Sequence, residues 1–154
     1  MVKIGGAALE NEEVLRCCAR AVVKLTHDGH RVAVVHGGGS TLTRTLQHLG
    51  KASSFVRGLR VTDAETRDVA LMVLAGIVNK KVVAAISAVG QPAVGLCGGD
   101  GMSFRARKKE NKGCDLGYVG EIAAVECRWL EATWSQGGIP VIASLALGSD
   151  REYY

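Results

Sequence analysis

Two apolar strand patterns in this chain each run directly into a glycine-rich turn, and each turn leads into a helical pattern. The first reads VKIGG over residues 2–6, and the second reads VAVVHGGG over residues 32–39. A glycine turn at the carboxyl end of a strand exposes backbone N–H groups, and the helix behind it adds the positive end of its dipole. Such turns bind phosphate or carboxylate groups. The pair therefore predicts one site for two anionic groups, with Lys3 as a mobile positive charge beside the first turn.

Four apolar strand patterns alternate with helical patterns along the chain. The expected strands are residues 2–5, 31–35, 93–97 and 140–144. Their continuous apolar runs indicate a parallel sheet covered on both faces, because a half-exposed strand would alternate apolar and polar residues. The predicted fold class is therefore α/β, a three-layer αβα sandwich with a mainly parallel central sheet. In addition, residues 103–107 and 117–125 can pair as a β-hairpin around a polar, lysine-rich tip.

The helical patterns have recognisable starts and stops. Asn11 can cap the first long helix, and Gly29 can end it. The TDAE segment at residues 62–65 is a capping-box pattern, and it opens a helical stretch towards residue 89 with an interruption expected near Gly76. Shorter helices are expected at residues 42–49 and 127–136. The spacing of the first helix predicts a buried face made of Val14, Cys18, Ala21, Val22 and Leu25.

The bulk composition predicts one globular domain. The chain has 154 residues, of which 47% are hydrophobic and 22% charged, and its net charge of +4 is mild. We expect no membrane partner, because no apolar run approaches ~18–20 residues and the start of the chain lacks a signal-peptide pattern. We expect no nucleic-acid partner either, because the basic cluster has no interleaved aromatic residues and is typical of a solvated loop. The cluster is Arg105, Arg107, Lys108, Lys109 and Lys112.

The cysteine pattern favours reduced thiols in a cytoplasm. The 5 cysteines form no CxxC motif, and none has a histidine at zinc spacing. An odd count without a signal peptide is typical of an intracellular protein, and the pattern predicts no metal site.

Neither glycine turn matches a P-loop or a dinucleotide-binding fingerprint, and the glycines could serve only to let helices pack close to strands. Lys3 could be a solvated terminal lysine, but its place between Val2 and Ile4 in an expected central strand favours an anionic partner. For His36 we favour a strand-end histidine with local hydrogen bonds, because no acid or nucleophile is spaced to make it a general base.

Arg60 lies in the segment GLRVTD at residues 58–63. A guanidinium group is a natural clamp for a carboxylate, because its fork binds both oxygens. The alternative is a surface pair between Arg60 and Asp63 of little energetic value. The chemistry of the residues leaves both interpretations open.

Six motifs occur in the order and spacing of the amino acid kinase family. They are KIGG, VVHGGG, GLRVTD, VGLCGGDG, DLGYVGE and GGIPVIA. The chain resembles this family over essentially its whole length. HGGG and GxRVTD together are more specific than either motif alone. The pair resembles the motifs of the acetylglutamate branch of the family.

The resemblance implies phosphoryl transfer from ATP to the γ-carboxylate of N-acetyl-L-glutamate in arginine biosynthesis, with Mg²⁺ accompanying the nucleotide. Lys3 matches the lysine that stabilises charge on the transferring phosphoryl group. Gly5 and Gly6 match the turn that faces the nucleotide phosphates, and Gly38 and Gly39 match the turn that contacts acetylglutamate and the γ-phosphoryl group. In the same way, Arg60 matches the arginine that holds the α-carboxylate, and the hairpin 103–125 matches a lid over the substrate.

The resemblance also sets expectations for the rest of the protein. Residues 1–154 match the N-terminal, acetylglutamate-binding domain, and the C-terminal ATP-binding domain is absent from this chain. We therefore expect the chain alone to be inactive. No helix precedes the first strand, so we expect a homodimer that is insensitive to arginine. Two alternatives remain open, a related kinase for an acetylated or carrier-linked aminoadipate of lysine biosynthesis and a non-catalytic arginine-sensing module of the same fold.

Overall fold

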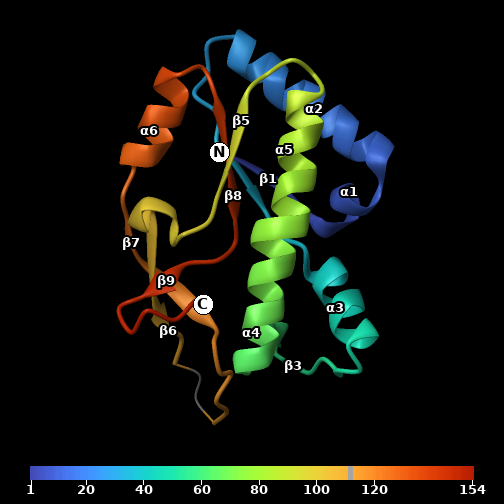
Figure 1. Ribbon diagram of the computed structural model, residues 1–154, viewed down its shortest axis with the longest axis vertical. Coiled ribbons are helices and arrows are strands. Elements are labelled where there is room, and N and C mark those ends of the chain that lie inside the picture. The colour runs from blue at the N-terminus through green and yellow to red at the C-terminus, as the bar shows by residue number, and fades with distance from the viewer. Residues whose placement is uncertain (111–112) are drawn as a thin grey trace.

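The structure, a computed structural model, describes residues 1–110 and 113–154. Within these residues the central sheet has four parallel strands in the order β1-β2-β8-β5, which pass through the middle of the molecule in Figure 1. The strands are β1 (Val2–Ile4), β2 (Val34–His36), β8 (Ile139–Ala143) and β5 (Ala93–Leu96). All four predicted strands are present, and the α/β fold class with a mainly parallel sheet is confirmed.

Helices cover both faces of this sheet, as Figure 1 shows. Helices α1 and α2 and a long composite helix lie on one face, and α6 lies on the other. Helix α3 follows β2 and packs against the composite helix. The helices are α1 (Gly6–Glu10), α2 (Glu12–His27), α3 (Gly39–His48), α4 (Ala64–Ala70), η1 (Leu71–Val78), α5 (Asn79–Ser87) and α6 (Arg128–Ser135).

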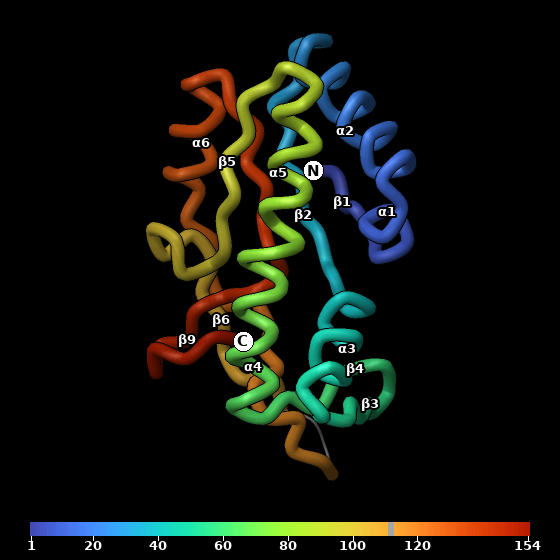
Figure 2. The backbone as a smooth tube through the Cα atoms, turned by 45° about the vertical axis from the view of Figure 1, so that its right-hand side comes forward, coloured from blue at the N-terminus to red at the C-terminus, as the bar shows by residue number. Residues whose placement is uncertain are grey.

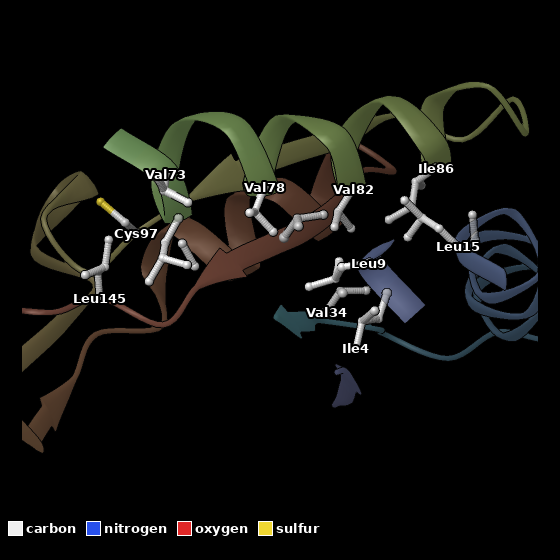
Figure 3. Packing of buried hydrophobic residues seen from close by; sticks show 14 of the residues in the cluster. Ile4, Leu9, Leu15, Val34, Val73, Val78, Val82, Ile86, Cys97 and Leu145 are labelled. Atoms are coloured by element: carbon white, nitrogen blue, oxygen red, sulfur yellow. The ribbon is translucent and has the colours of Figure 1, made fainter. Parts of the chain in front are cut away.

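The main core lies between the sheet and the composite helix. Figure 3 shows Val82 of this helix near Val34 and Ile4 of the sheet, whereas Val73 lies towards Cys97 and Leu145. Each fully buried aliphatic side chain of this kind contributes about 1.5–3 kcal/mol relative to exposure. The opposite face has a smaller cluster of buried residues, Ala33, Leu130 and Ile142.

The composite helix changes type in its middle. Leu71–Val78 is a π-helix between two α-helical segments, so the interruption expected near Gly76 is a change of helix type and not a break. Backbone bonds there run from residue i+5 to residue i, as from the Asn79 N–H to the Leu74 carbonyl. Burial follows the same spacing of five residues. The buried pairs are Val73 with Leu74 and Val78 with Asn79.

By length and composition alone, the stretch Ala64–Ser87 could cross a bilayer, which differs from the expectation drawn from apolar runs. This is weak evidence, because the core helix of a soluble protein passes the same test. In the structure the apolar face of this stretch packs into the core (Figure 3).

Two short β-structures complete the fold. In the first, β3 (Phe55–Val56) pairs with β4 (Leu59–Arg60) across a tight turn. In the second, β6 (Phe104–Lys108) pairs with β7 (Gly120–Val125) as predicted, and β9 (Leu147–Gly148) adds a third strand. A short 3-10 turn, η2 (Asp100–Met102), precedes β6. Within the basic cluster, Arg107 pairs with Glu121 and Lys108 with Asp115, whereas Lys112 lies outside the described residues.

The prediction that Lys3 occupies a central strand is wrong for the described residues. There β1 is an edge strand, paired only with β2. Lys3 is exposed, so the argument from burial does not apply to it.

The predicted buried face of α2 is wrong in part, since Val22 is buried and Cys18 packs against the core as predicted, but the rest of the face is displaced. The buried residues are Leu15, Ala19, Val22 and Val23, whereas Val14 and Leu25 are exposed. Two apolar rows share this helix, and contact with α5 selects the row that contains Leu15. The predicted cap is confirmed, because the Asn11 side chain accepts a hydrogen bond from the Val14 N–H at 3.1 Å.

The start of α4 differs from the predicted capping box. Asp63 is the N-cap, and its side chain accepts a hydrogen bond from the Thr66 N–H at 2.8 Å. Thr62 is instead buried and bridges to Gly117. The tertiary contact of Thr62 therefore overrides its local capping preference.

Candidate functional site

The two glycine turns lie side by side at one edge of the sheet. Strands β1 and β2 are parallel, with Ile4 opposite His36, so both chains leave the sheet at the same end, where α1 and α3 begin (Figure 2). A Cβ atom added at Gly6 would lie 3.6 Å from Ser40 Oγ at the start of α3. The two turns are therefore close together, as the sequence predicted.

The second turn is packed tightly against the composite helix. Gly38 has a φ of +155°, which favours glycine, and it caps α3. A Cβ atom at this position would lie 2.7 Å from Leu74 Cδ2 and 3.1 Å from Val78 Cγ2. Any other residue here would have a strained φ and would displace the Leu74 side chain.

His36 is buried below the second turn and forms local hydrogen bonds, as predicted. Its Nδ1 lies 2.8 Å from the Gly37 carbonyl oxygen, and its Nε2 lies 3.1 Å from Asn79 Nδ2. The Ser144 hydroxyl donates to the His36 carbonyl at 2.7 Å. Burial lowers the pKa of His36, and the bond to the Gly37 carbonyl opposes this effect. The neutral ring is therefore favoured.

Arg60 lies beside the second turn. Its Nη2 donates to the Gly39 carbonyl oxygen at 3.2 Å and to Thr43 Oγ1 at 2.7 Å, and its Nη1 donates to the Ser53 hydroxyl. The guanidinium carbon lies 4.6 Å from the centre of the Phe55 ring. Partial burial lowers the pKa of Arg60 from its ordinary value. These contacts hold the guanidinium at the amino end of α3.

The alternative Arg60–Asp63 pair does not form. Asp63 instead pairs with Lys51, whose ammonium lies 2.8 Å from the carboxylate. The Lys51 ammonium, followed by the Thr66 hydroxyl and N–H, lowers the pKa of Asp63 to about 2. Across residues 1–110 and 113–154, no carboxylate pairs with Arg60.

Lys3 lies on the face of the sheet that borders a large cavity. It is opposite Val35 in the parallel register, so the two side chains share a face. Val35 lines the cavity. In the part of the chain that the structure describes, no side chain or backbone group bonds to the Lys3 ammonium. The charge is therefore available to a ligand.

The cavity has a volume of about 740 Å³, which is within the usual range for small-molecule sites. It lies between the Val35 face of the sheet and the β6–β7 hairpin, and it includes Arg60, Ser144 and Leu74. Leu74 also contacts Gly38, so the cavity adjoins the second glycine turn. Most of its wall is apolar.

A backbone bridge joins the segment of Arg60 to the arm of the hairpin. The Thr62 N–H donates to the Leu116 carbonyl at 2.9 Å, and the Tyr118 N–H donates to the Thr62 carbonyl at 2.7 Å. Gly117 has a φ of +69°, and a Cβ atom there would lie 2.1 Å from the Thr62 carbonyl oxygen. Arg67 stacks on Tyr118, with its guanidinium carbon 4.3 Å from the ring centre. The motifs GLRVTD and DLGYVGE thus meet in space.

Sequence reasoning missed Asn79, Ser144 and Thr43. Asn79 is 1% exposed and touches both β2 and β8. Its signal was available, because it is a lone amide at the end of the apolar run LMVLAGIV. Ser144 and Thr43 had no comparable signal.

The described residues give no sign of a metal centre. Among residues 1–110 and 113–154, no group of three or more His, Cys, Asp or Glu side chains could hold a metal ion. All 5 cysteines are free thiols in the structure.

The fold is that of an α/β domain with two adjacent glycine-rich turns at the carboxyl end of its parallel sheet. The chain matches the amino acid kinase family over residues 1–153, and it belongs to that family. It is 64% identical to an acetylglutamate kinase of Acidobacterium capsulatum and 55% identical to one of Koribacter versatilis, in each case over all 154 residues. The chain spans only 59% of the length of each of these relatives.

The fold is also similar to that of a larger protein. N-acetylglutamate synthase from Neisseria gonorrhoeae, solved with coenzyme A and N-acetyl-glutamate, matches with a TM-score of 0.81 and 26% identity. The match covers 99% of this chain and 35% of that one.

Proposed function

We propose that the complete protein transfers a phosphoryl group from ATP to the γ-carboxylate of N-acetyl-L-glutamate, in arginine biosynthesis, and that residues 1–154 are its acetylglutamate-binding domain. The observation that carries this proposal is the meeting of Arg60 with the second glycine turn at the amino end of α3, beside the cavity. The names of the two relatives described above support the same reaction.

In this reaction the protein supplies position and positive charge. Phosphoryl transfer needs little covalent work from the enzyme, because most catalysis comes from positioning and electrostatic stabilisation. We assign the α-carboxylate to Arg60 and the γ-phosphoryl group to the N–H groups of Gly38 and Gly39. Lys3 stabilises the negative charge that spreads over the transferring group.

ATP is the expected co-substrate, with its phosphates beside Gly5 and Gly6. The space around Gly5 is open, since a Cβ atom there would meet nothing within 4 Å. The residues present do not fit a resident Mg²⁺, because the described segments bring together no cluster of ligands. An ion would have to arrive with the nucleotide, and we assign it no step.

We expect a cytoplasmic homodimer without nucleic-acid or membrane partners. Met72 and Ile77 support self-association, because they lie five residues apart on the π-helix and are 61% and 59% exposed. A contact between copies would bury these side chains. The free thiols are in accord with a reducing compartment.

Two alternatives use the same site. A kinase for an acetylated or carrier-linked aminoadipate would need the same carboxylate clamp. Its substrate would have one more methylene group. The second alternative is a non-catalytic arginine-sensing module of the same fold, a fold that this chain shares with an N-acetylglutamate synthase solved with L-arginine. The availability of the Lys3 charge favours a kinase, because a sensor has no need of a charge aimed at a phosphoryl group.

The test is a phosphoryl-transfer assay of the full-length protein with ATP and either N-acetyl-L-glutamate or N-acetyl-aminoadipate. Calorimetric titration of acetylglutamate should accompany it, with wild type and Arg60→Lys. We expect turnover of acetylglutamate, and a Kd weaker by about 10- to 100-fold in Arg60→Lys, because lysine cannot form two parallel bonds to a carboxylate.

The control is Arg44→Lys, which changes an exposed arginine of α3 that pairs with Glu10. Its affinity and melting temperature should match those of wild type. Preference for acetylaminoadipate would support the second kinase, and arginine binding without turnover would support the sensor. Equal affinities for wild type and Arg60→Lys would remove Arg60 from the site.

A further inference from the structure

The buried pair of Asn79 and His36 lies next to the second glycine turn, and neither residue lines the cavity. We infer that these two side chains are positioning residues, which preset the Gly38 N–H towards an anionic ligand. This inference rests on the proposed function, in which the second turn holds an anionic group. The contacts of these side chains run from the helix to the strand and then to the turn.

The first step is the orientation of the Asn79 amide. Its Nδ2 lies 2.9 Å from the Val141 carbonyl oxygen, which can only accept. Its Oδ1 lies 3.2 Å from Lys80 Nζ, which can only donate. Both neighbours require the same orientation, so a flip of the amide is excluded. The second N–H of Nδ2 is then directed at His36.

The second step is the tautomer of His36. Its Nε2 faces the Asn79 N–H at 3.1 Å and must accept, so the ring proton lies on Nδ1. Nδ1 then donates to the Gly37 carbonyl oxygen at 2.8 Å. The hydrogen bonds therefore run in one direction, from Lys80 through Asn79 and His36 to the Gly37 carbonyl.

The third step is the peptide between Gly37 and Gly38. A trans peptide is planar, so its C=O and N–H groups point in opposite directions. Because the Gly37 carbonyl points at the His36 ring, the Gly38 N–H points away from it. Within residues 1–110 and 113–154, the Gly38 N–H has no hydrogen-bond acceptor. A donor fixed in direction and left without a protein acceptor is suited to an anion.

The position of Asn79 depends on the π-helix. Val73 and Leu74 are buried, and five residues later Val78 and Asn79 are buried as well. An α-helix would repeat its buried face after three or four residues, whereas the π-helix brings Asn79 onto the sheet. Gly95 of β5 leaves room for the amide, because a Cβ atom there would lie 1.9 Å from Asn79 Oδ1.

Two substitutions at His36 separate positioning from packing. In His36→Asn, the side-chain Nδ2 occupies about the place of the ring Nδ1 and can still donate to the Gly37 carbonyl. In His36→Gln, the amide reaches the place of Nε2 and can accept from Asn79, but the bond to Gly37 is lost. If His36 had a purely structural role, the two variants would have similar kcat values, because each keeps one of the two hydrogen bonds.

In the full-length protein we expect His36→Gln to lower kcat by about 10- to 100-fold, the range for a misplaced catalytic group, with a smaller change in the KM for ATP. His36→Asn should stay within about threefold of wild type, the smaller loss that a retained Gly37 bond implies. The control is His48→Gln at the exposed end of α3, which should change nothing. Equal losses of kcat in the Asn and Gln variants would overturn the inference.

A second measurement does not depend on activity. ¹⁵N NMR of the histidine rings, without ligand, should show His36 protonated on Nδ1 only, and His36→Asn identifies its signals. In Asn79→Asp the carboxylate can only accept, so Nε2 should become protonated and the Gly38 amide resonance should shift. Protonation of Nε2 in wild type would overturn the inference. If the protein instead lacks turnover but shows the Nδ1 tautomer, the proposed function fails while this geometry stands.

Discussion

The two glycine turns follow neighbouring parallel strands and have similar sequences, yet they are built differently. The second turn has a glycine at a φ of +155°, packed against Leu74 and braced from below by His36. In the first turn, Gly5 has a φ of −84°, which any residue adopts, and open space around its Cβ position. The fold therefore explains the glycine at position 38 but not the glycine at position 5. Under the proposed function, we assign Gly5 to close approach of the nucleotide phosphates to the backbone.

Among the substitutions that test this difference between the turns, we expect the largest effect from Lys3, whose charge lies beside the first turn. In full-length protein, Lys3→Ala should lower kcat on the order of 10²–10³-fold, because it removes a charge aimed at the transferring phosphoryl group. Steady-state kinetics should show a smaller change in substrate affinity. Lys24→Ala, at an exposed pair with Asp28, is the control. A near-normal kcat in Lys3→Ala would make Lys3 a solvated lysine.

The next comparison sets Gly38→Ala against Gly5→Ala. Gly38→Ala should lower the free energy of unfolding by about 2–4 kcal/mol, because it combines a strained φ with a clash against Leu74. Gly5→Ala should leave the unfolding curve unchanged and lower only the activity. Denaturant unfolding of both variants measures the difference. Equal stability losses would show that the two turns are built alike.

Gly95→Ala tests the support behind the second turn. Its Cβ atom would meet Asn79 Oδ1 at 1.9 Å and Lys80 Nζ at 2.6 Å, so Asn79 must move. We expect a loss of about 1–3 kcal/mol in stability, the cost of an unsatisfied buried amide. Gly76→Ala is the matched control, because a Cβ atom there meets nothing within 4 Å. That variant should be neutral, or more stable by about 0.5–1 kcal/mol.

The smallest effect is the pH dependence that His36 contributes. Burial lowers the pKa of His36 in the folded state, so the unfolded chain binds the proton more readily. The contribution of His36 to stability is therefore complete above its ordinary pKa of about 6.5 and is lost as the pH falls through the folded pKa. Urea unfolding at several pH values should show a shallower dependence for His36→Asn than for wild type. Parallel curves for the two proteins would contradict this assignment.

The strands and most helices were predictable, because their signals are local. The glycine turns mark the ends of β1 and β2, and the Asn11 cap marks the start of α2. The buried face of α2 was not predictable in detail, because Val14 and Leu15 both begin plausible apolar rows. Only contact with α5 decides between them, and that contact is tertiary.

The candidate site was predictable in its parts but not in its assembly. The turns and Arg60 carry recognisable chemistry in the sequence, and their adjacency follows from parallel strands. Asn79 stands out in the sequence as a lone amide after an apolar run, but its contact with the sheet depends on a π-helix that no residue pattern marks. The edge position of β1 was misjudged for a similar reason, since strand order is a property of the whole sheet.

Because of the π-helix, the geometry of the site also depends on the number of residues in this segment of the chain. Its hydrogen bonds enclose one more residue than those of an α-helix, so the number of residues between Leu74 and Asn79 fixes the direction in which Asn79 faces. Deleting one residue there would turn every later position of α5 by about 100° relative to the sheet. Substitutions along Leu71–Val78 can be absorbed one at a time, whereas a change of length would carry the amide away from His36 and Val141 together.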